Sequence, residues 1–180
     1  MSIESVKAYL EPFGLAGRVI EFDASSATVA EAAADLGCEP ARIAKTMAFR
    51  GAEGPFLVVL AGDAKVDNPR YKARFHCKAM MVRPEELVQA VGHPMGGVCP
   101  FAVADGVPVY LDESLRRFAE VYPAAGTASS AVRLTVAELE GCAQNFAGWV
   151  DIGKAWREGE ACPRPAVKPE SARPPRNLRP

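Results

Sequence analysis

The ten residues from Gly92 to Phe101, GHPMGGVCPF, are too rich in glycine and proline to continue a helix or a strand. Glycine tolerates positive φ and lets the backbone approach a ligand closely, whereas proline fixes φ and removes an amide donor. The stretch therefore predicts a shaped loop that holds backbone amides and carbonyls in one arrangement. Such a loop suits ligand binding, although glycine and proline are also the usual residues of an ordinary connection.

Helical and strand-like segments alternate irregularly on both sides of this loop. Thr28-Val-Ala-Glu31 and Thr135-Val-Ala-Glu138 each match a capping box, and two β-leaning runs around Gly51 to Gly54 predict a hairpin. We expect helices over 3–13, 29–36, 40–44, 68–74, 84–91, 113–118 and 135–147, and strands over 18–22, 45–50, 55–61, 107–112, 121–125 and 131–134. This irregular order favours an α/β fold with a compact mixed sheet over a Rossmann or TIM arrangement.

Composition excludes several classes of protein. With 180 residues, 49% of them hydrophobic, the chain can bury one core, and it has no run of about 18 apolar residues that could span a membrane. The polar start lacks the regions of a signal peptide, which predicts a cytoplasmic protein without a membrane partner. The five cysteines are scattered and never form a C-x-x-C pair, so we expect neither disulfides nor zinc. A net charge of −1 gives no overall attraction to polyanions.

The chain divides into a globular domain over 1–157 and a Pro/Arg-rich tail over 158–180. Apolar periodicity is nearly absent from the tail, which predicts disorder. The tail is also basic. It could contact a polyanion weakly or serve only to keep the protein in solution.

Few side chains are placed for chemistry. Lys45 follows a helix and opens a strand, where its ammonium either binds an anion or reaches solvent along its apolar stem. His93 and Cys99 share the glycine-rich loop and could form a nucleophile pair, but a buried inert cysteine explains the pattern as well. His76 and His93 are the chain's two histidines, which leaves too few ligands at recognised spacing for a metal site. Asp112 and other aspartates at strand ends are ordinary turn residues that could also form an acid/base pair.

The ordered combination of several segments resembles the YbaK family, the free-standing relatives of the prolyl-tRNA synthetase editing domain. The segments are Ile43-Ala-Lys-Thr-Met-Ala-Phe49, Leu60-Ala-Gly-Asp63 with Lys72 downstream, Gly92 to Phe101, Val109-Tyr-Leu-Asp112, and Ala125-Gly-Thr-Ala-Ser-Ser130. The resemblance covers roughly residues 6–154. It implies a partly open barrel with surrounding helices and trans-editing, the hydrolysis of the ester between a wrong amino acid and a tRNA, most often tRNA for proline.

The resemblance also implies roles for particular residues. Lys45 would hold the 3′ end of the substrate and, with backbone groups of Gly96 and Gly97, act on the ester. The expected substrate-binding residues are Lys45, Thr46, Lys72, His93, Val98, Pro100, Phe101, Asp112, Gly126 and Ser129. An aminoacyl ester is already activated and has a neighbouring ribose hydroxyl, so positioning and polarisation could suffice without a side-chain nucleophile.

The expected partners are the 3′ end of aminoacyl-tRNA and prolyl-tRNA synthetase, with no cofactor. Specificity stays open, with a small side chain favoured; Met47, Met95 and Val98 could line the pocket or pack in the core. Two alternatives remain: a non-catalytic module that binds the tRNA acceptor end, and a cysteine-dependent hydrolase of another small ester.

Overall fold

The computed structural model describes residues 2–23 and 28–157, so the tail predicted over 158–180 lies outside the described residues. The α-helices are α1 (Ile3–Leu10), α2 (Val29–Leu36), α3 (Asn68–Phe75), α4 (Leu87–Val91) and α5 (Val136–Cys142). The strands are β1 (Val19–Glu21), β2 (Ile43–Gly51), β3 (Gly54–Ala61), β4 (Lys65–Val66), β5 (Val109–Asp112), β6 (Glu120–Pro123), β7 (Ser130–Val132), β8 (Leu134–Thr135), β9 (Phe146–Val150) and β10 (Gly153–Lys154). Short 3₁₀ turns are η1 (Glu11–Phe13), η2 (Ala16–Arg18), η3 (Pro40–Arg42), η4 (Pro84–Glu86) and η5 (Glu113–Arg117).

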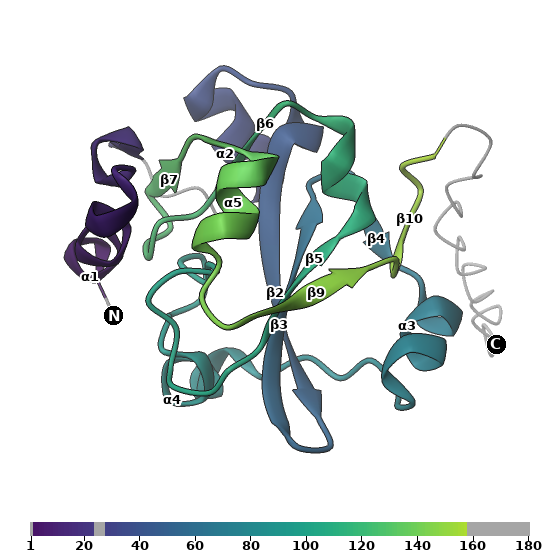
Figure 1. Cartoon of the computed structure of the whole chain (residues 1–180). Coiled ribbons are helices and arrows are strands. Elements are labelled where there is room, and N and C mark those ends of the chain that lie inside the picture. Colours follow the sequence, from purple (N-terminus) through teal and green to yellow (C-terminus); the bar gives the residue numbers. More distant parts are fainter. Residues whose placement is uncertain (1, 24–27, 158–180) are drawn as a thin grey trace, which may run out of the picture.

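A six-stranded sheet in the order β8-β6-β2-β3-β5-β9 forms the centre of the molecule and curls into a half-barrel (Figure 1). The hairpin β2–β3 is antiparallel, while β2–β6, β3–β5 and β5–β9 are parallel. Two short antiparallel pairs, β1–β7 and β4–β10, lie outside this sheet. The predicted class, a compact mixed sheet forming a partly open barrel with surrounding helices, is confirmed.

Strand β3 is the buried axis of this sheet. Its residues from Leu57 to Ala61 are all 0% exposed, because β3 is paired on both sides and packed on both faces. A continuous apolar run is the pattern expected of such a strand. The hairpin therefore anchors β2, whose other edge forms part of the site described below.

The helices begin where the sequence provides caps. Thr28 and Thr135 each accept a hydrogen bond from the amide three residues on, and the glutamate at that position bonds back to the threonine amide. In Figure 1, α1 lies at one side of the molecule and α3 at the other, with α5 beside the hairpin and β9 crossing in front of it.

One helix is shorter than the sequence suggests. The helix expected over 135–147 ends at Cys142, and Phe146–Val150 instead forms β9 beside β5. Helical spacing could not reveal this pairing, because β5 lies more than thirty residues earlier in the chain. The helix expected over 3–13 is α-helical to Leu10 and continues as a 3₁₀ turn to Phe13.

Candidate functional site

The outer edge of β2 is open in the middle. At one end, Ile43 and Ala44 pair with β6. At the other end, the amide of Val82 donates to the carbonyl of Ala48 at 2.9 Å, and the amide of Arg50 donates to the carbonyl of Met80 at 2.8 Å. Within the described ranges no strand pairs with this edge at residues 45–47.

A cavity of about 590 Å³ lies against this open stretch. Its walls come from α2, from β2, from residues 81–87, from the glycine-rich loop, and from residues 122–131. The lining is mostly apolar, and its two charged side chains, Lys45 and Arg83, are both cations. The lining residues are Phe22, Thr28, Val29, Ala32, Leu36, Ile43, Ala44, Lys45, Thr46, Met47, Ala48, Met81, Val82, Arg83, Pro84, Leu87, Met95, Gly96, Val98, Tyr122, Ala124, Thr127, Ala128, Ser130 and Ala131.

Lys45 is held in a fixed position at this cavity. Its ammonium donates to the carbonyl of Gly62 at 3.2 Å and to the carbonyl of Ala64. Burial lowers the pKa of Lys45 from its ordinary value, and the negative charges of Asp63 and Asp112 offset part of that effect. Because an ammonium has three donors, two carbonyls orient the group and leave one donor for a ligand.

Thr46 adds a polar group beside Lys45. Its Oγ1 is buried and has no hydrogen-bond partner among the described residues. A buried hydroxyl without a partner costs about 1–3 kcal/mol, so a ligand oxygen or nitrogen that bonds to it would recover that cost.

The glycine-rich loop forms its wall of the cavity by close packing. Gly96 has φ of +86°, and a β-carbon there would lie 2.7 Å from Cβ of Ala128. A β-carbon on Gly97 would lie 2.3 Å from the carbonyl oxygen of Gly126. Gly126 has φ of +95° and itself packs against Val6 of α1, whose Cγ2 would lie 3.0 Å from a β-carbon on Gly126. The glycine-rich loop thus packs on the turn around Gly126, and this turn packs on α1.

Only part of the loop faces the cavity. Gly96 and Val98 line it, whereas the amide of Gly97 donates to the carbonyl of Pro94 at 3.0 Å and closes a turn. Phe101 is 0% exposed, and Pro100 is buried with its carbonyl accepting from the amide of Gln144 at 2.9 Å.

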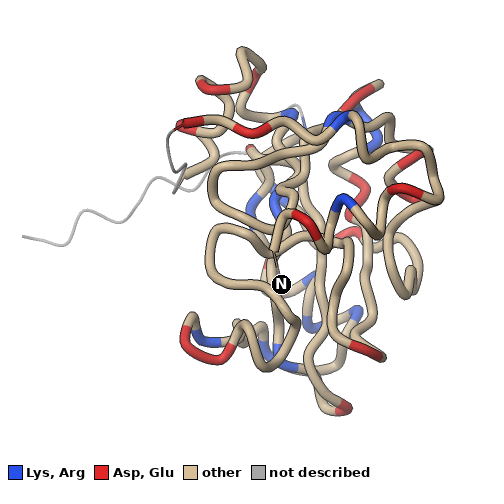
Figure 2. The backbone as a smooth tube through the Cα atoms, turned by 90° about the vertical axis from the view of Figure 1, so that its left-hand side faces the viewer, with Lys and Arg blue, Asp and Glu red and all other residues tan. Residues whose placement is uncertain are grey.

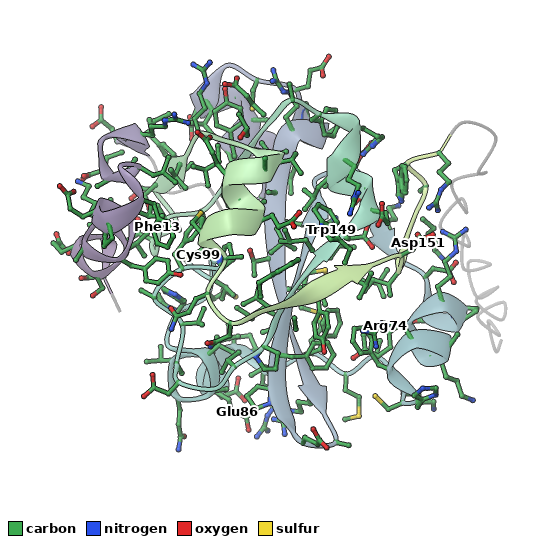
Figure 3. The ribbon with its side chains drawn as sticks, viewed as in Figure 1. Phe13, Arg74, Glu86, Cys99, Trp149 and Asp151 are labelled. Carbon is green, nitrogen blue, oxygen red and sulfur yellow. The ribbon has the colours of Figure 1, made fainter. Side chains whose placement is uncertain are left out.

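His93 and Cys99 lie in the interior, away from the cavity lining. Nε2 of His93 is 2.7 Å from the carbonyl of Phe101, and Sγ of Cys99 is 3.5 Å from the same oxygen. Burial lowers the pKa of His93 and raises the pKa of Cys99 to about 12. Figure 3 places Cys99 close to α5, well inside the molecule. A neutral thiol in this position is not poised to act as a nucleophile.

Asp112 and Ser129 also lie outside the cavity lining. The carboxylate of Asp112 is 0% exposed and accepts from the amides of Ser114, Ile152 and Gly153 at 3.0, 2.8 and 3.1 Å, so it fastens the chain after β9 to the end of β5. The carbonyl of Ser129 accepts from the amide of Phe22 at 3.0 Å.

Lys72 is exposed on α3, outside the cavity lining. Figure 3 shows its neighbour on the same helix, Arg74, on the opposite side of the molecule from Cys99. The structure therefore brings Lys45, Thr46, Gly96 and Val98 together and leaves Lys72 apart from them.

Several residues that line the cavity could not be identified as site residues from the sequence. Leu36 and other residues of α2 look like ordinary core positions of an amphipathic helix, and Tyr122 looks like a strand residue. Arg83 precedes a helix as one of many surface arginines. Met47, Met95 and Val98, for which the sequence allows either pocket lining or core packing, all line the cavity, and Met47 and Val98 also pack against the core.

Within residues 2–23 and 28–157, no group of three or more His, Cys, Asp or Glu side chains is placed to hold a metal ion. In the same ranges, no helix is both long and apolar enough to cross a membrane.

A curled mixed sheet, with an apolar cavity that is lined in part by a glycine-rich loop and by an oriented lysine, defines a small α/β domain. The aminoacyl-tRNA editing domain family matches this chain over residues 23–142, and the chain belongs to that family, which includes the YbaK proteins.

Relatives support the same assignment. The uncharacterized protein YwhH of Bacillus subtilis (strain 168) is 44% identical over 158 residues, which span 87% of this chain and 99% of YwhH. The proline–tRNA ligase of Thermotoga sp. (strain RQ2) is 31% identical over 90 residues, which span 49% of this chain and 15% of the ligase.

Solved structures share the fold. One, described as a candidate trans-editing enzyme for prolyl tRNA synthetase, superposes with a TM-score of 0.76 at 31% identity, covering 84% of this chain and 96% of its own. The hypothetical protein APE2540 superposes with a TM-score of 0.74 at 26% identity, covering 83% of this chain and 99% of its own.

Proposed function

We propose that this protein is a trans-editing deacylase that hydrolyses the ester between a wrong amino acid and the 3′-terminal adenosine of a tRNA. The proposed substrate is tRNA for proline carrying a small amino acid, and the proposed setting is the cytoplasm, with prolyl-tRNA synthetase as a further partner. The observation that carries this proposal is the apolar cavity at the open edge of β2, with Lys45 held against it. Membership of the editing-domain family supports it.

The residues suggest how the ester would be held. The free donor of Lys45 would bond to an oxygen of the terminal nucleotide, and Oγ1 of Thr46 would bond to the aminoacyl group or the ribose. The backbone of Gly96 and Val98 would form the facing wall. The backbone of Thr46, which faces the outer edge of β2 as Ala48 and Arg50 do, would offer further bonds to the substrate.

The lining offers no carboxylate, histidine or cysteine among the described residues. Hydrolysis would then depend on a positioned water, helped by the neighbouring ribose hydroxyl, and on polarisation of the ester carbonyl. In this mechanism Gly97 has an indirect role, because its amide is occupied by Pro94.

The aminoacyl side chain would enter the same cavity, whose lining includes Ala32, Ala48 and Ala128 as well as Met47 and Val98. An apolar lining of this kind suits a small side chain with few polar groups. A pocket of this kind separates side chains that differ by one methylene by about 1–3 kcal/mol. The proposal therefore expects a graded preference among small amino acids rather than absolute selection.

The decisive test is incubation of the purified protein with a panel of mischarged tRNAs, including alanyl-, cysteinyl-, seryl- and threonyl-tRNA for proline, with correctly charged prolyl-tRNA as the control. Release of one or two small amino acids with prolyl-tRNA left intact is the expected result. Failure to release any amino acid from the panel would reject the deacylase.

A non-catalytic module that binds the tRNA acceptor end is the second candidate, because the lining lacks a side-chain base. In that case charged tRNA would bind and keep its amino acid. The cysteine-dependent hydrolase is disfavoured, because Cys99 is 0% exposed and has a raised pKa.

A further inference from the structure

Most basic side chains among the described residues form an ion pair with a neighbouring carboxylate. Ion pairs join Lys7 to Glu21, Arg18 to Glu138, Arg42 and Arg133 to Glu120, Arg50 and Arg83 to Glu86, Arg70 and Arg157 to Asp151, Arg116 to Glu113, Arg117 to Asp63, and Lys154 to Asp67. Figure 2 shows the resulting pattern, with basic and acidic positions interspersed over the backbone. The surface as a whole therefore attracts polyanions weakly.

One segment departs from this pattern. From Asn68 to Arg83 the chain contains no Asp or Glu. Lys72, Arg74 and Lys78 are exposed, and none of the three forms an ion pair within the part of the chain that the structure describes. No carboxylate of residues 2–23 and 28–157 pairs with their positive charge.

The same segment leads to the cavity. It leaves the C-terminal end of α3, and its far end is fixed to β2 by the hydrogen bonds of Met80 and Val82. Met81, Val82 and Arg83 then line the cavity. From Lys78 to Arg83 an extended chain spans at most about 18 Å. Lys78 and the cavity are therefore joined by a short segment that is anchored to the sheet, and Lys72 and Arg74 lie on the helix from which this segment leaves.

Arg74 is also held in place. Its guanidinium lies 5.1 Å from the ring centre of Phe75 and 5.4 Å from that of Tyr110. A cation over aromatic rings is oriented without losing its charge. The group can therefore contact an anion with little loss of side-chain entropy.

We propose that Lys72, Arg74 and Lys78 form a phosphate-contacting surface for the RNA whose 3′ end enters the cavity. This proposal rests on the proposed function, because that function makes RNA the partner. In this arrangement α3 and the segment that follows it contact the phosphate backbone of the acceptor stem. Lys45 and the cavity bind the terminal aminoacyl-adenosine. Contacts of this kind position a nucleic acid without reading its sequence.

Salt dependence distinguishes this surface from a merely cationic one. Each phosphate that a protein neutralises contributes about 0.7–0.9 to the slope of log affinity against log salt concentration. Replacing Lys72, Arg74 and Lys78 by glutamine should lower that slope by about 2 and weaken the binding of uncharged tRNA roughly tenfold at low salt. The double variant Lys72→Gln/Lys78→Gln leaves the aromatic stacking of Arg74 intact and should lower the slope by about 1.5.

A matched control removes the same charge elsewhere. The variant Lys7→Gln/Arg116→Gln/Arg133→Gln loses three exposed cations that are paired with carboxylates, including one stacked on Trp149 at 4.0 Å. It should keep the wild-type salt slope within about 0.5. An equal loss of slope in the control and in the Lys72/Arg74/Lys78 variant would overturn the proposal, because net charge alone would then explain both.

Binding of uncharged tRNA is measured by fluorescence anisotropy at several salt concentrations, so the result does not depend on hydrolysis. The proposal of a phosphate-contacting surface would be overturned if the Lys72/Arg74/Lys78 variant kept the wild-type salt slope. It would also be overturned if the wild-type protein did not bind uncharged tRNA. A salt slope that falls in the Lys72/Arg74/Lys78 variant, without hydrolysis of any mischarged tRNA by the wild-type protein, would instead support the phosphate-contacting surface and reject the deacylase. Where hydrolysis occurs, the triple variant should raise KM for mischarged tRNA at least fivefold more than KM for an aminoacyl-adenosine, which has no stem.

Discussion

Gly97 lies so close to Gly126 that a β-carbon on Gly97 would be 2.3 Å from the carbonyl oxygen of Gly126. The glycine-rich loop can therefore press its backbone against the turn before β7, and this contact seals one wall of the cavity. The value of Gly97 is its lack of a side chain.

Gly97→Ala should displace the loop, because backbone oxygen cannot yield by the distance required. We expect a loss of about 1–3 kcal/mol of stability, measured by urea unfolding, and a loss of deacylation larger than the loss of folded protein explains. Gly17→Ala is the control, because nothing lies within 4 Å of its β-carbon position and its φ is not positive. Equal behaviour of the two variants would remove the close-contact argument.

Lys45→Ala should lower deacylation by about 10²-fold, because a substrate whose terminal nucleotide is no longer anchored is misplaced at the reacting centre. The change also leaves the carbonyls of Gly62 and Ala64 without their ammonium partner, so thermal unfolding must be recorded in parallel. Wild-type rates in a folded Lys45→Ala protein would exclude Lys45 from the mechanism.

The lowered pKa of Lys45 predicts an alkaline limit on tRNA binding. Burial disfavours the ammonium, so the charge is lost as pH rises through a value below the ordinary 10.5. Binding of uncharged tRNA should weaken at high pH in the wild-type protein and persist to higher pH in Lys45→Arg, because a guanidinium stays protonated. If tRNA binding depended on pH in the same way in the wild type and in Lys45→Arg, the charge of Lys45 would make no contact with the tRNA.

His93 should make the folded state sensitive to acid. Its pKa is lowered from 6.5 by burial, so in the window below 6.5 the unfolded chain binds a proton that the native chain does not. The stabilisation is present above about pH 6.5 and is lost as pH falls from there through the folded-state pKa. His93→Gln can still donate to the carbonyl of Phe101 and cannot titrate, so its stability measured by urea unfolding should fall less between about pH 7 and pH 5 than that of the wild type. A steeper fall in the variant would contradict this account.

Cys99→Ser should keep deacylase activity within about threefold. The thiol is fully buried, its pKa is raised to about 12, and a serine hydroxyl can take over the bond to the carbonyl of Phe101. The measurement is the initial rate on the best mischarged tRNA, with iodoacetamide treatment of the wild type alongside. Complete loss of activity in a folded Cys99→Ser protein would restore the thiol nucleophile.

Local patterns in the sequence predicted much of this fold. The capping boxes at Thr28 and Thr135 mark the starts of α2 and α5, and the alternation after Lys45 marks the hairpin. The limit of local patterns is visible at Phe146–Val150, where pairing with β5 overrides a continued helix. The spacing of apolar residues within one segment does not show which distant strand that segment pairs with.

The candidate site was predicted in part. Lys45 and the glycine-rich loop stand out because lysine at a strand start and clustered glycines are unusual. Asp112 and His93 stand out for the same chemical reasons, yet they are buried and hydrogen-bonded to backbone groups, away from the cavity lining. The apolar wall supplied by α2 could not be distinguished from core, because both need the same side chains.

The interrupted edge of β2 has a consequence for aggregation. An exposed strand edge is a template for pairing with other chains, and a long apolar one promotes fibre formation. Here β6 occupies one end of the edge and the segment around Val82 occupies the other, so the gap at residues 45–47 is too short to nucleate a foreign sheet. The middle of this edge can thus stay unpaired without leaving a long edge on which other chains could pair.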